Sequence, residues 1–387
     1  MWNKGILVCG FYGYHNLGDE AMLQGLRHWL RRCDRNFPLT VYSKDPEDTR
    51  QRHGVNVLDN RYAPRRRIQL QQWIRHSLAL LQNRYFILGG GDLLRDAPDR
   101  DVASEWLRPL ERAISMGKRT LVIGISVGNI WRETTQSRLK TALNQVNLIA
   151  VRDQVSRQRL ITLGITQPIF VMSDLALEVV SPKPTWSIND TYPTIGISVR
   201  AVAGRIPHQT DQTFYKHLAA TIDHLIEHYN ANIHLLPFQA YPDAFRRHHS
   251  PSVDDEIAIA KVSQLSRYPK KLHIHKRFLD LETLIACLSS LDIVIGTRLH
   301  SIILAAGLGI PVVAIDYAPK VRGFMSEIGQ LDYCIDPASF TPQQSVALIV
   351  KILHNHSAVQ AQLSTAIKTY RTRMDEVDVA FQQVLLS

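Results

Sequence analysis

The fold of this chain is decided by residues 293–320, which read IVIGTRLHSIILAAGLGIPVVAIDYAPK. The β-branched run at 293–295 predicts a buried strand, and Pro311 to Ile315 predicts the next one. Between them, the small apolar residues from His300 to Ala306 predict a helix that two glycines end. The stretch is therefore expected to form a strand-helix-strand unit of a parallel sheet.

The polar residues of this stretch follow the two predicted strands. Arg298 and His300 come directly after the first strand, and Lys320 comes shortly after the second. Open parallel sheets bind ligands at the carboxyl ends of their strands, so these three cations are expected to converge on one anion. For His300 alone, a core histidine that caps its own helix is an equally good interpretation, and its two cationic neighbours favour the site.

The same arrangement recurs along the chain. Five predicted strands of the N-terminal half end in a glycine or a polar residue before a helix, which is typical of a doubly wound α/β fold. A proline-rich segment at 181–193 then predicts a linker. We expect two Rossmann-like domains with a cleft between them, at 1–180 and 194–387, with the last helices packing back on the N-terminal domain.

Glycine-rich loops follow two of the predicted N-terminal strands. Residues 10–20 read GFYGYHNLGDE and lead into a predicted helix at 21–32, and residues 89–92 read GGGD. We expect the backbone at Gly13, Gly18, Gly90 and Gly91 to contact a ligand near the helix N-terminus. Asp19 and Glu20 begin that helix, where favourable interaction with the helix dipole would explain one of the two acids.

Composition bounds the class of protein. The chain has 387 residues, 45% of them hydrophobic, and lacks the apolar run of roughly 18 residues that suggests a membrane span. Its N-terminal apolar run is too short for a signal peptide, so we expect a cytoplasmic protein. The four cysteines are scattered without a CxxC or other metal-ligand spacing, so we expect reduced thiols and no metal site.

The net charge of +10 raises the question of anionic partners. The basic residues are dispersed and accompany no nucleic-acid-binding motif, so nucleic acid is not expected as a partner. One basic segment, from Arg65 to Arg84, places Trp73, Ile74 and Leu78 at helical spacing. Packing of this helix on the first domain is the simpler interpretation, and contact with an anionic membrane surface is the alternative.

Several motifs together resemble a known family, the polysaccharide pyruvyl transferases of the CsaB type. They lie in the family's order from Gly10 to Gly329. They are GFYGYHNLGDEA at 10–21, GGGDL at 89–93, VRD at 151–153, GTRLHS at 296–301 and DYAPKVR at 316–322.

The resemblance implies a fold, a reaction and partners. It implies a GT-B-like fold and an enzyme that moves pyruvate from phosphoenolpyruvate onto two hydroxyls of a glycan sugar, which gives a cyclic ketal. Phosphoenolpyruvate would be a co-substrate, with no further cofactor and no metal. The acceptor would be a glycan or a lipid-linked saccharide, which places the enzyme peripherally at the inner face of the plasma membrane.

The residues can be matched to that reaction. Arg152 or Arg298 suits the donor carboxylate, because a guanidinium binds a carboxylate with two parallel hydrogen bonds. Lys320 suits the leaving phosphate, and His300 suits either protonation of the enol carbon or contact with the phosphate. Asp19 or Glu20 suits the base that activates the acceptor hydroxyl.

Two other functions compete with this interpretation. A GT-B glycosyltransferase with a nucleotide-sugar donor would share the basic site but needs an acidic residue for the donor ribose, and none is evident. A non-enzymatic glycan-binding or lipid-carrier-binding scaffold would not require the whole set of acidic and basic residues.

Overall fold

The computed structural model describes most of the chain, namely residues 5–33, 37–60, 66–98, 101–182, 192–202, 210–246, 250–278 and 280–386. The chain divides into two compact units. The first consists of Met1–Tyr14, Asp19–Val179 and Arg371–Ser387, and the second of His15–Gly18 and Val180–Tyr370. Much of the predicted linker, at 183–191, lies outside the described residues.

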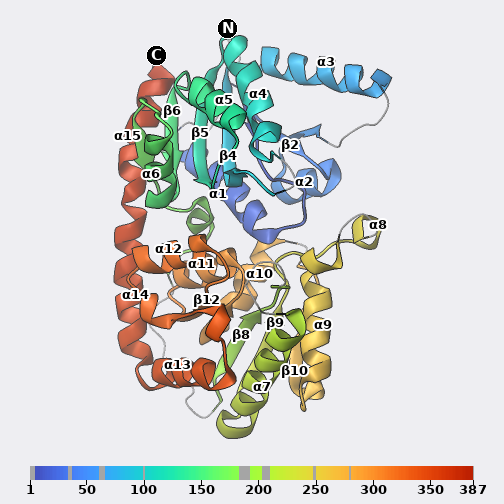
Figure 1. Ribbon diagram of the computed structural model, residues 1–387, viewed down its shortest axis with the longest axis vertical. Helices are drawn as coiled ribbons and strands as arrows, with labels where there is room; N and C mark the ends of the chain where they lie inside the picture. Colours follow the sequence, from blue (N-terminus) through green and yellow to red (C-terminus); the bar gives the residue numbers. More distant parts are fainter. Residues whose placement is uncertain are drawn as a thin grey trace. The chain divides into compact units, whose positions relative to one another are not determined.

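The first unit contains a seven-stranded parallel sheet with the strand order β3-β2-β1-β4-β5-β6-β7 (Figure 1). The order reverses between β1 and β4, and doubly wound sheets bind ligands at such a reversal. The strands are β1 (Ile6–Cys9), β2 (Leu39–Ser43), β3 (Asn56–Asp59), β4 (Tyr85–Leu94), β5 (Arg119–Val127), β6 (Leu148–Val151) and β7 (Ile169–Val171).

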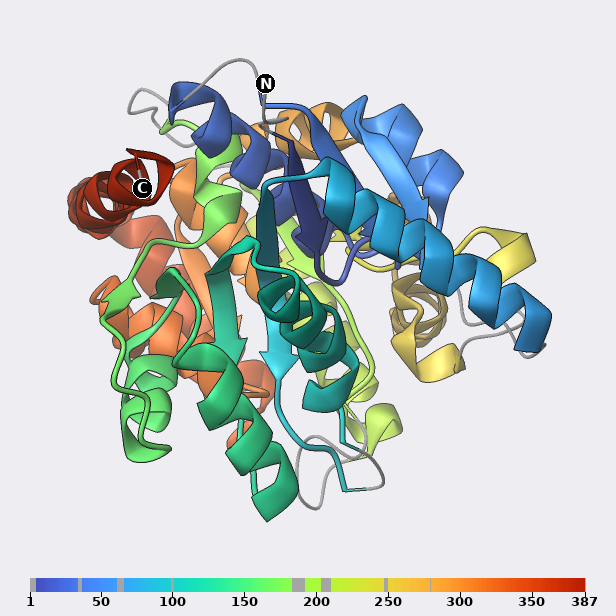
Figure 2. The same ribbon diagram turned by 90° about the horizontal axis from the view of Figure 1, so that it is seen from above.

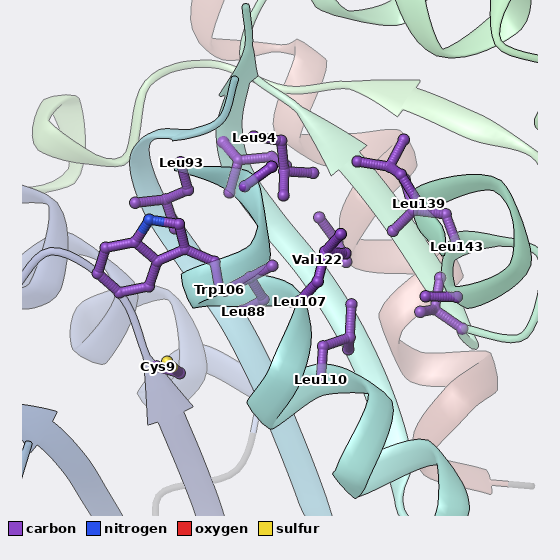
Figure 3. Close-up of a cluster of buried hydrophobic side chains, with 14 of the residues drawn as sticks. Cys9, Leu88, Leu93, Leu94, Trp106, Leu107, Leu110, Val122, Leu139 and Leu143 are labelled. Atoms are coloured by element: carbon purple, nitrogen blue, oxygen red, sulfur yellow. The ribbon is translucent and has the colours of Figure 1, made fainter. Parts of the chain in front are cut away.

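Helices cover both faces of this sheet. Trp106, Leu107 and Leu110 of α4 pack toward Leu88 of β4 and Val122 of β5, and all five side chains are buried (Figure 3). The helices are α1 (Leu17–Cys33), α2 (Pro46–His53), α3 (Arg66–Gln82), α4 (Ala103–Ser115), α5 (Glu133–Leu143), α6 (Gln154–Thr162) and α15 (Arg373–Leu386), with a 3-10 turn at Leu175–Val179.

Helix α15 packs against α1 in this unit. The ring of Trp29 lies 4.8 Å from that of Phe381, and its indole N–H donates to Asp378 at 2.5 Å. Helix α1 begins at Leu17, four residues before the predicted start at Ala21, so the end of the preceding loop belongs to the helix. Helical spacing in the sequence predicts that Met22, Leu26, Trp29 and Leu30 share one face of this helix, and all four side chains are buried.

Helix α3 differs from the simpler expectation. Trp73, Ile74, Leu78 and Leu81 are 58%, 44%, 49% and 64% exposed, so the interpretation that this stripe packs on the domain is wrong. Another face of the helix packs inward instead, through His76, Ala79 and Leu80. In Figures 1 and 2, α3 lies at the periphery of the first unit. Arg65 lies outside the described residues.

The second unit contains a six-stranded parallel sheet with the order β10-β9-β8-β11-β12-β13. The opening stretch of sequence supplies β11 and β12 with a helix, α11, between them, as predicted. The strands are β8 (Thr194–Ser198), β9 (Asn232–Leu236), β10 (Leu272–Ile274), β11 (Ile293–Gly296), β12 (Val312–Ile315) and β13 (Cys334–Ile335).

The helices of the second unit follow its strands in the alternation expected of an α/β fold. They are α7 (Asp211–Tyr229), α8 (Asp243–Arg246), α9 (Asp255–Leu265), α10 (Leu281–Ser289), α11 (Leu299–Gly307), α12 (Pro319–Glu327), α13 (Pro342–His354) and α14 (His356–Arg371), with 3-10 turns at Pro251–Val253, Pro269–Lys271, Leu331–Tyr333 and Pro337–Ser339. None of the helices in the described part of the chain has both the length and the hydrophobicity needed to cross a bilayer.

Candidate functional site

The glycine-rich loop after β1 meets the glycine segment of β4 where the strand order of the first unit reverses. Residues 89–92, predicted to form a loop, instead lie within β4, whose pairing with β5 shifts register between Gly91 and Leu94. The Tyr12 hydroxyl donates to the Gly89 carbonyl at 2.7 Å, and a Cβ at Gly10 would lie 2.1 Å from the same oxygen. Gly90 and Gly91 have φ values of +72° and +89°, a left-handed backbone that favours glycine. A side chain at Gly91 would come within 3.4 Å of Asp19 Oδ1, so this segment of β4 lies directly beside Asp19.

The two candidate bases differ in their surroundings. Glu20 is 1% exposed, and its carboxylate accepts the Gly13 N–H at 3.1 Å and lies 2.7 Å from His53 Nε2. Both Glu20 oxygens therefore hold other parts of the first unit together. Asp19 is 6% exposed and, after burial itself, contributes most to raising the pKa of the Tyr12 hydroxyl. Asp19 therefore lies close to the Tyr12 hydroxyl and to Gly91, whereas Glu20 binds Gly13 and His53.

Arg152 lies at the end of β6 within a buried polar cluster. Its Nε donates to Ser126 Oγ at 2.6 Å, and its Nη1 lies 3.2 Å from Asp174. The Ser126 hydroxyl in turn donates to Asp153, whose other oxygen caps α6 through the Ser156 N–H at 2.7 Å. The cluster fixes the arginine at the carboxyl edge of the first sheet.

Arg298 follows β11 and is held by partners that local sequence does not indicate. Its Nε and Nη2 both donate to Asp255, and its Nη1 donates to Gln239 Oε1 at 2.9 Å. Burial works to lower the pKa of Arg298, but the charge and hydrogen bonds of Asp255 outweigh it and raise that pKa. Most of the guanidinium N–H groups thus bind the protein, so Arg298 connects the end of β11 to Asp255 and Gln239.

Two helices at this edge begin without a side-chain cap. Helices α7, α9, α10 and α13 are capped by Thr210, Asp254, Asp280 and Thr341, respectively. Among the described residues, no side chain caps α11 or α12, which follow the adjacent strands β11 and β12. Uncapped first-turn N–H groups attract anions, and the first turns of these two helices carry His300 and Lys320.

The neighbouring strand β8 brings a third cation to the same edge. Arg200 follows β8, is 5% exposed, and its guanidinium carbon lies 4.6 Å from the centre of the Tyr317 ring. Strands β8, β11 and β12 are adjacent and parallel, and Arg200, His300 and Lys320 follow their last residues by two, four and five positions. We call these three residues the cationic edge.

A segment from the start of the chain, His15–Gly18, belongs to the second unit and packs on this edge. Leu17 N–H donates to the Phe238 carbonyl at 2.8 Å, and Asn16 forms an antiparallel bridge with Gln239. A Cβ at Gly18 would lie 2.0 Å from His300 Nδ1, so only glycine lets the imidazole lie so close. The Gly18 and Gly13 N–H groups, predicted to contact a ligand, donate within the protein at 3.1 Å, to Asn16 and Glu20.

The sequence reasoning missed three members of this region. Asp255 and Gln239 lie far along the chain from Arg298, and no periodicity links them to it. Arg200 carried a detectable signal, because it directly follows a β-branched strand in the same way as Arg298.

The comparison with protein families decides the relationship. Residues 16–319 match the family described as polysaccharide pyruvyl transferase. The chain belongs to this family. The matched range contains every predicted site residue except Gly13 and Lys320, which lie just outside its two ends.

A curated relative supports the assignment. The chain is 26% identical over 271 residues to the amylovoran biosynthesis protein AmsJ of Erwinia amylovora. The match covers 67% of this chain and 64% of the relative, which is slightly less than two thirds of that protein.

Solved structures show the fold. A glycosyltransferase from Rickettsia africae aligns with a TM-score of 0.60 at 13% identity, over 99% of each chain. The UDP-GlcNAc 2-epimerase from Methanocaldococcus jannaschii aligns with a TM-score of 0.58 at 11% identity, over 90% of this chain and 92% of that one. The prediction of a GT-B-like α/β fold with two parallel sheets is confirmed.

Proposed function

We propose that this polysaccharide pyruvyl transferase family member transfers pyruvate from phosphoenolpyruvate to two hydroxyls of a glycan sugar. The observation that carries the proposal is the pair of helices α11 and α12, which begin at neighbouring strand ends without side-chain caps and carry His300 and Lys320 in their first turns. Two helix N-termini and a lysine suit the phosphate of this donor.

The donor also carries a carboxylate, which calls for an arginine. Arg298 is a positioning residue in this proposal, because its guanidinium binds Asp255 and Gln239. Arg200, whose guanidinium lies over the Tyr317 ring, is the candidate of the second unit, and Arg152 is the candidate of the first unit. A charge-neutral substitution of each, with donor affinity as the readout, separates the two.

The reaction balances with these groups. His300 donates a proton to the methylene carbon of the donor, which becomes a methyl group while C2 becomes electrophilic. One acceptor hydroxyl adds to C2, the C2–O bond to phosphate breaks, and the second hydroxyl closes the ketal. Of the two hydroxyl protons, one replaces that given by His300 and the other leaves with the phosphate. Asp19 acts as the base for the acceptor hydroxyl.

A cavity in the first unit is the proposed seat of the acceptor sugar. It has a volume of about 200 Å³ and lies at the carboxyl ends of β1, β2 and β3. Its lining combines hydrogen-bonding and charged groups, as sugar recognition requires. The lining includes Tyr42, Asn60, His76, Glu105, Arg108 and Arg112.

The exposed apolar side chains of α3 suggest that the acceptor is attached to a membrane lipid. We define the α3 stripe as Ile74, Leu78 and Leu81, which recur at i, i+4 and i+7 and all face solvent. His76 of the same helix lines the acceptor cavity from the opposite face. We propose that these exposed apolar side chains contact a membrane interface peripherally, which would bring the protein to a lipid-linked acceptor.

The test of the proposed function is product analysis. Purified protein is incubated with phosphoenolpyruvate and a lipid-linked glycan extract, and the glycans are analysed by mass spectrometry. Phosphate release together with glycans that gain a pyruvate ketal is expected. Transfer of a sugar from UDP-sugars in the parallel incubation, without any ketal, would instead establish a nucleotide-sugar glycosyltransferase, the alternative that the fold permits.

A further inference from the structure

Three side chains of the second unit with affinity for metals lie together although the sequence separates them. His234 Nδ1 lies 3.0 Å from His275 Nε2, and Cys287 Sγ lies 3.6 Å from the same Nε2. Ligand atoms of all three residues lie within 4.8 Å of one another. The separations along the chain, 41 and 12 residues, match no local metal-binding motif.

The fold brings the three together by ordinary sheet geometry. His234 of β9 and His273 of β10 are cross-strand partners in a parallel pair, so their side chains share one face. His275 follows two residues after His273, on the same face, and its N–H donates to the Leu235 carbonyl at 3.0 Å. Cys287 comes from α10. Three separate elements therefore each contribute one ligand.

The distances fit a small tetrahedral metal ion. With metal–nitrogen bonds of ~2.0–2.1 Å and a metal–sulfur bond of ~2.3 Å, tetrahedral geometry puts two nitrogens ~3.4 Å apart and a nitrogen and a sulfur ~3.6 Å apart. The observed separations are 3.0 Å and 3.6 Å. The nitrogen–nitrogen separation is thus a few tenths of an ångström shorter than the ideal value, and the nitrogen–sulfur separation equals it.

Hydrogen bonding leaves part of the His234 ring unsatisfied. Within the described part of the chain, the buried Nε2 of His234 has no hydrogen-bond partner.

We propose that His234, His275 and Cys287 bind a divalent transition metal ion of the zinc type, which ties β9, β10 and α10 together. His273, whose ring stacks on His234 at 4.7 Å, or a water molecule completes the coordination. The site lies on the β9–β10 side of the sheet, while the cationic edge lies at β8, β11 and β12. It is therefore a structural site, independent of the proposed pyruvyl transfer.

The test is metal binding by the tag-free, full-length protein. After dialysis against a chelator, the protein is titrated with Co²⁺ and then with Zn²⁺. We expect about one ion per chain, a thiolate-to-cobalt charge-transfer band, and loss of that band on Zn²⁺ addition. Cys287→Ala should abolish the band and weaken binding by more than the roughly 10–100-fold typical of outer-shell changes.

Matched variants keep the test decisive. Cys334→Ala removes another half-buried free cysteine of the same unit and should leave the band unchanged. His275→Gln is a second ligand variant, and circular dichroism establishes that each variant is folded. Absence of the cobalt band in the wild type, or an equal band in Cys287→Ala, would overturn the proposal.

Discussion

The carboxyl edges of the two sheets differ in their charged side chains and in the helices that begin there. In the first unit, side chains at this edge bind one another, as Glu20 binds His53 and Arg152 binds Asp174. In the second unit, a similar pair of Arg298 with Asp255 lies beside two helices that begin without side-chain caps among the described residues. We propose that the first edge positions Asp19 and that the second edge receives the anionic donor.

The largest expected effect concerns the first edge. Asp19→Asn removes the proposed base, so kcat should fall by about 10²–10⁴, while affinity for phosphoenolpyruvate stays at the wild-type value. Steady-state phosphate release and calorimetry measure the two quantities. Glu47→Gln, at an exposed acid of α2, is the control. Normal turnover of Asp19→Asn would place the base elsewhere and end the proposed division between the edges.

Gly18→Ala tests the contact that positions His300. The added methyl would lie 2.0 Å from His300 Nδ1, so the imidazole must move, and a displacement of about 1 Å costs on the order of 10² in kcat. Gly323→Ala in α12 is the control, because its methyl meets no described atom within 4 Å. Equal kcat values for the two variants would show that the position of His300 is unimportant.

Lys320→Ala tests the second edge. Losing a charge-assisted contact to the donor phosphate costs roughly 1.5–3 kcal/mol, or about 10–150-fold in donor affinity. Lys351→Ala removes a lysine of α13 that contacts the Tyr333 ring and should leave affinity unchanged. The reverse result, with only Lys351→Ala affected, would exclude Lys320 from the donor site.

The smallest expected effect concerns the α3 stripe. Replacing Ile74, Leu78 and Leu81 by glutamine should abolish flotation with anionic vesicles and leave the melting temperature nearly unchanged, since these side chains face solvent. An Arg65/Arg66/Arg67→Ala variant should lose the salt-sensitive part of the attraction. Wild-type protein that stays in the soluble fraction with anionic vesicles at low salt would refute membrane docking.

The sequence alone predicted the parts of the fold that local pattern encodes. β11, α11 and β12 follow from β-branched runs and glycines within residues 293–320, and the strand-end positions of Arg152 and Arg298 follow from the same pattern. The core face of α1 follows from helical spacing.

Contacts between distant segments could not be predicted in this way. Asp255 lies 43 residues from Arg298, and Cys287 meets His275 only through the fold. Which face of α3 turns inward was also undecided, because apolar spacing shows that a face exists but not what it contacts. The prediction that Trp73, Ile74 and Leu78 form the packed face failed for that reason.

The most direct test of the account is calorimetric titration of phosphoenolpyruvate into two single variants beside the wild type. The account predicts that Asp19→Asn binds the donor as tightly as the wild type, while Lys320→Ala binds it about 10–150-fold more weakly. Loss of affinity in Asp19→Asn with full affinity in Lys320→Ala would contradict it, because the donor would then depend on the first edge.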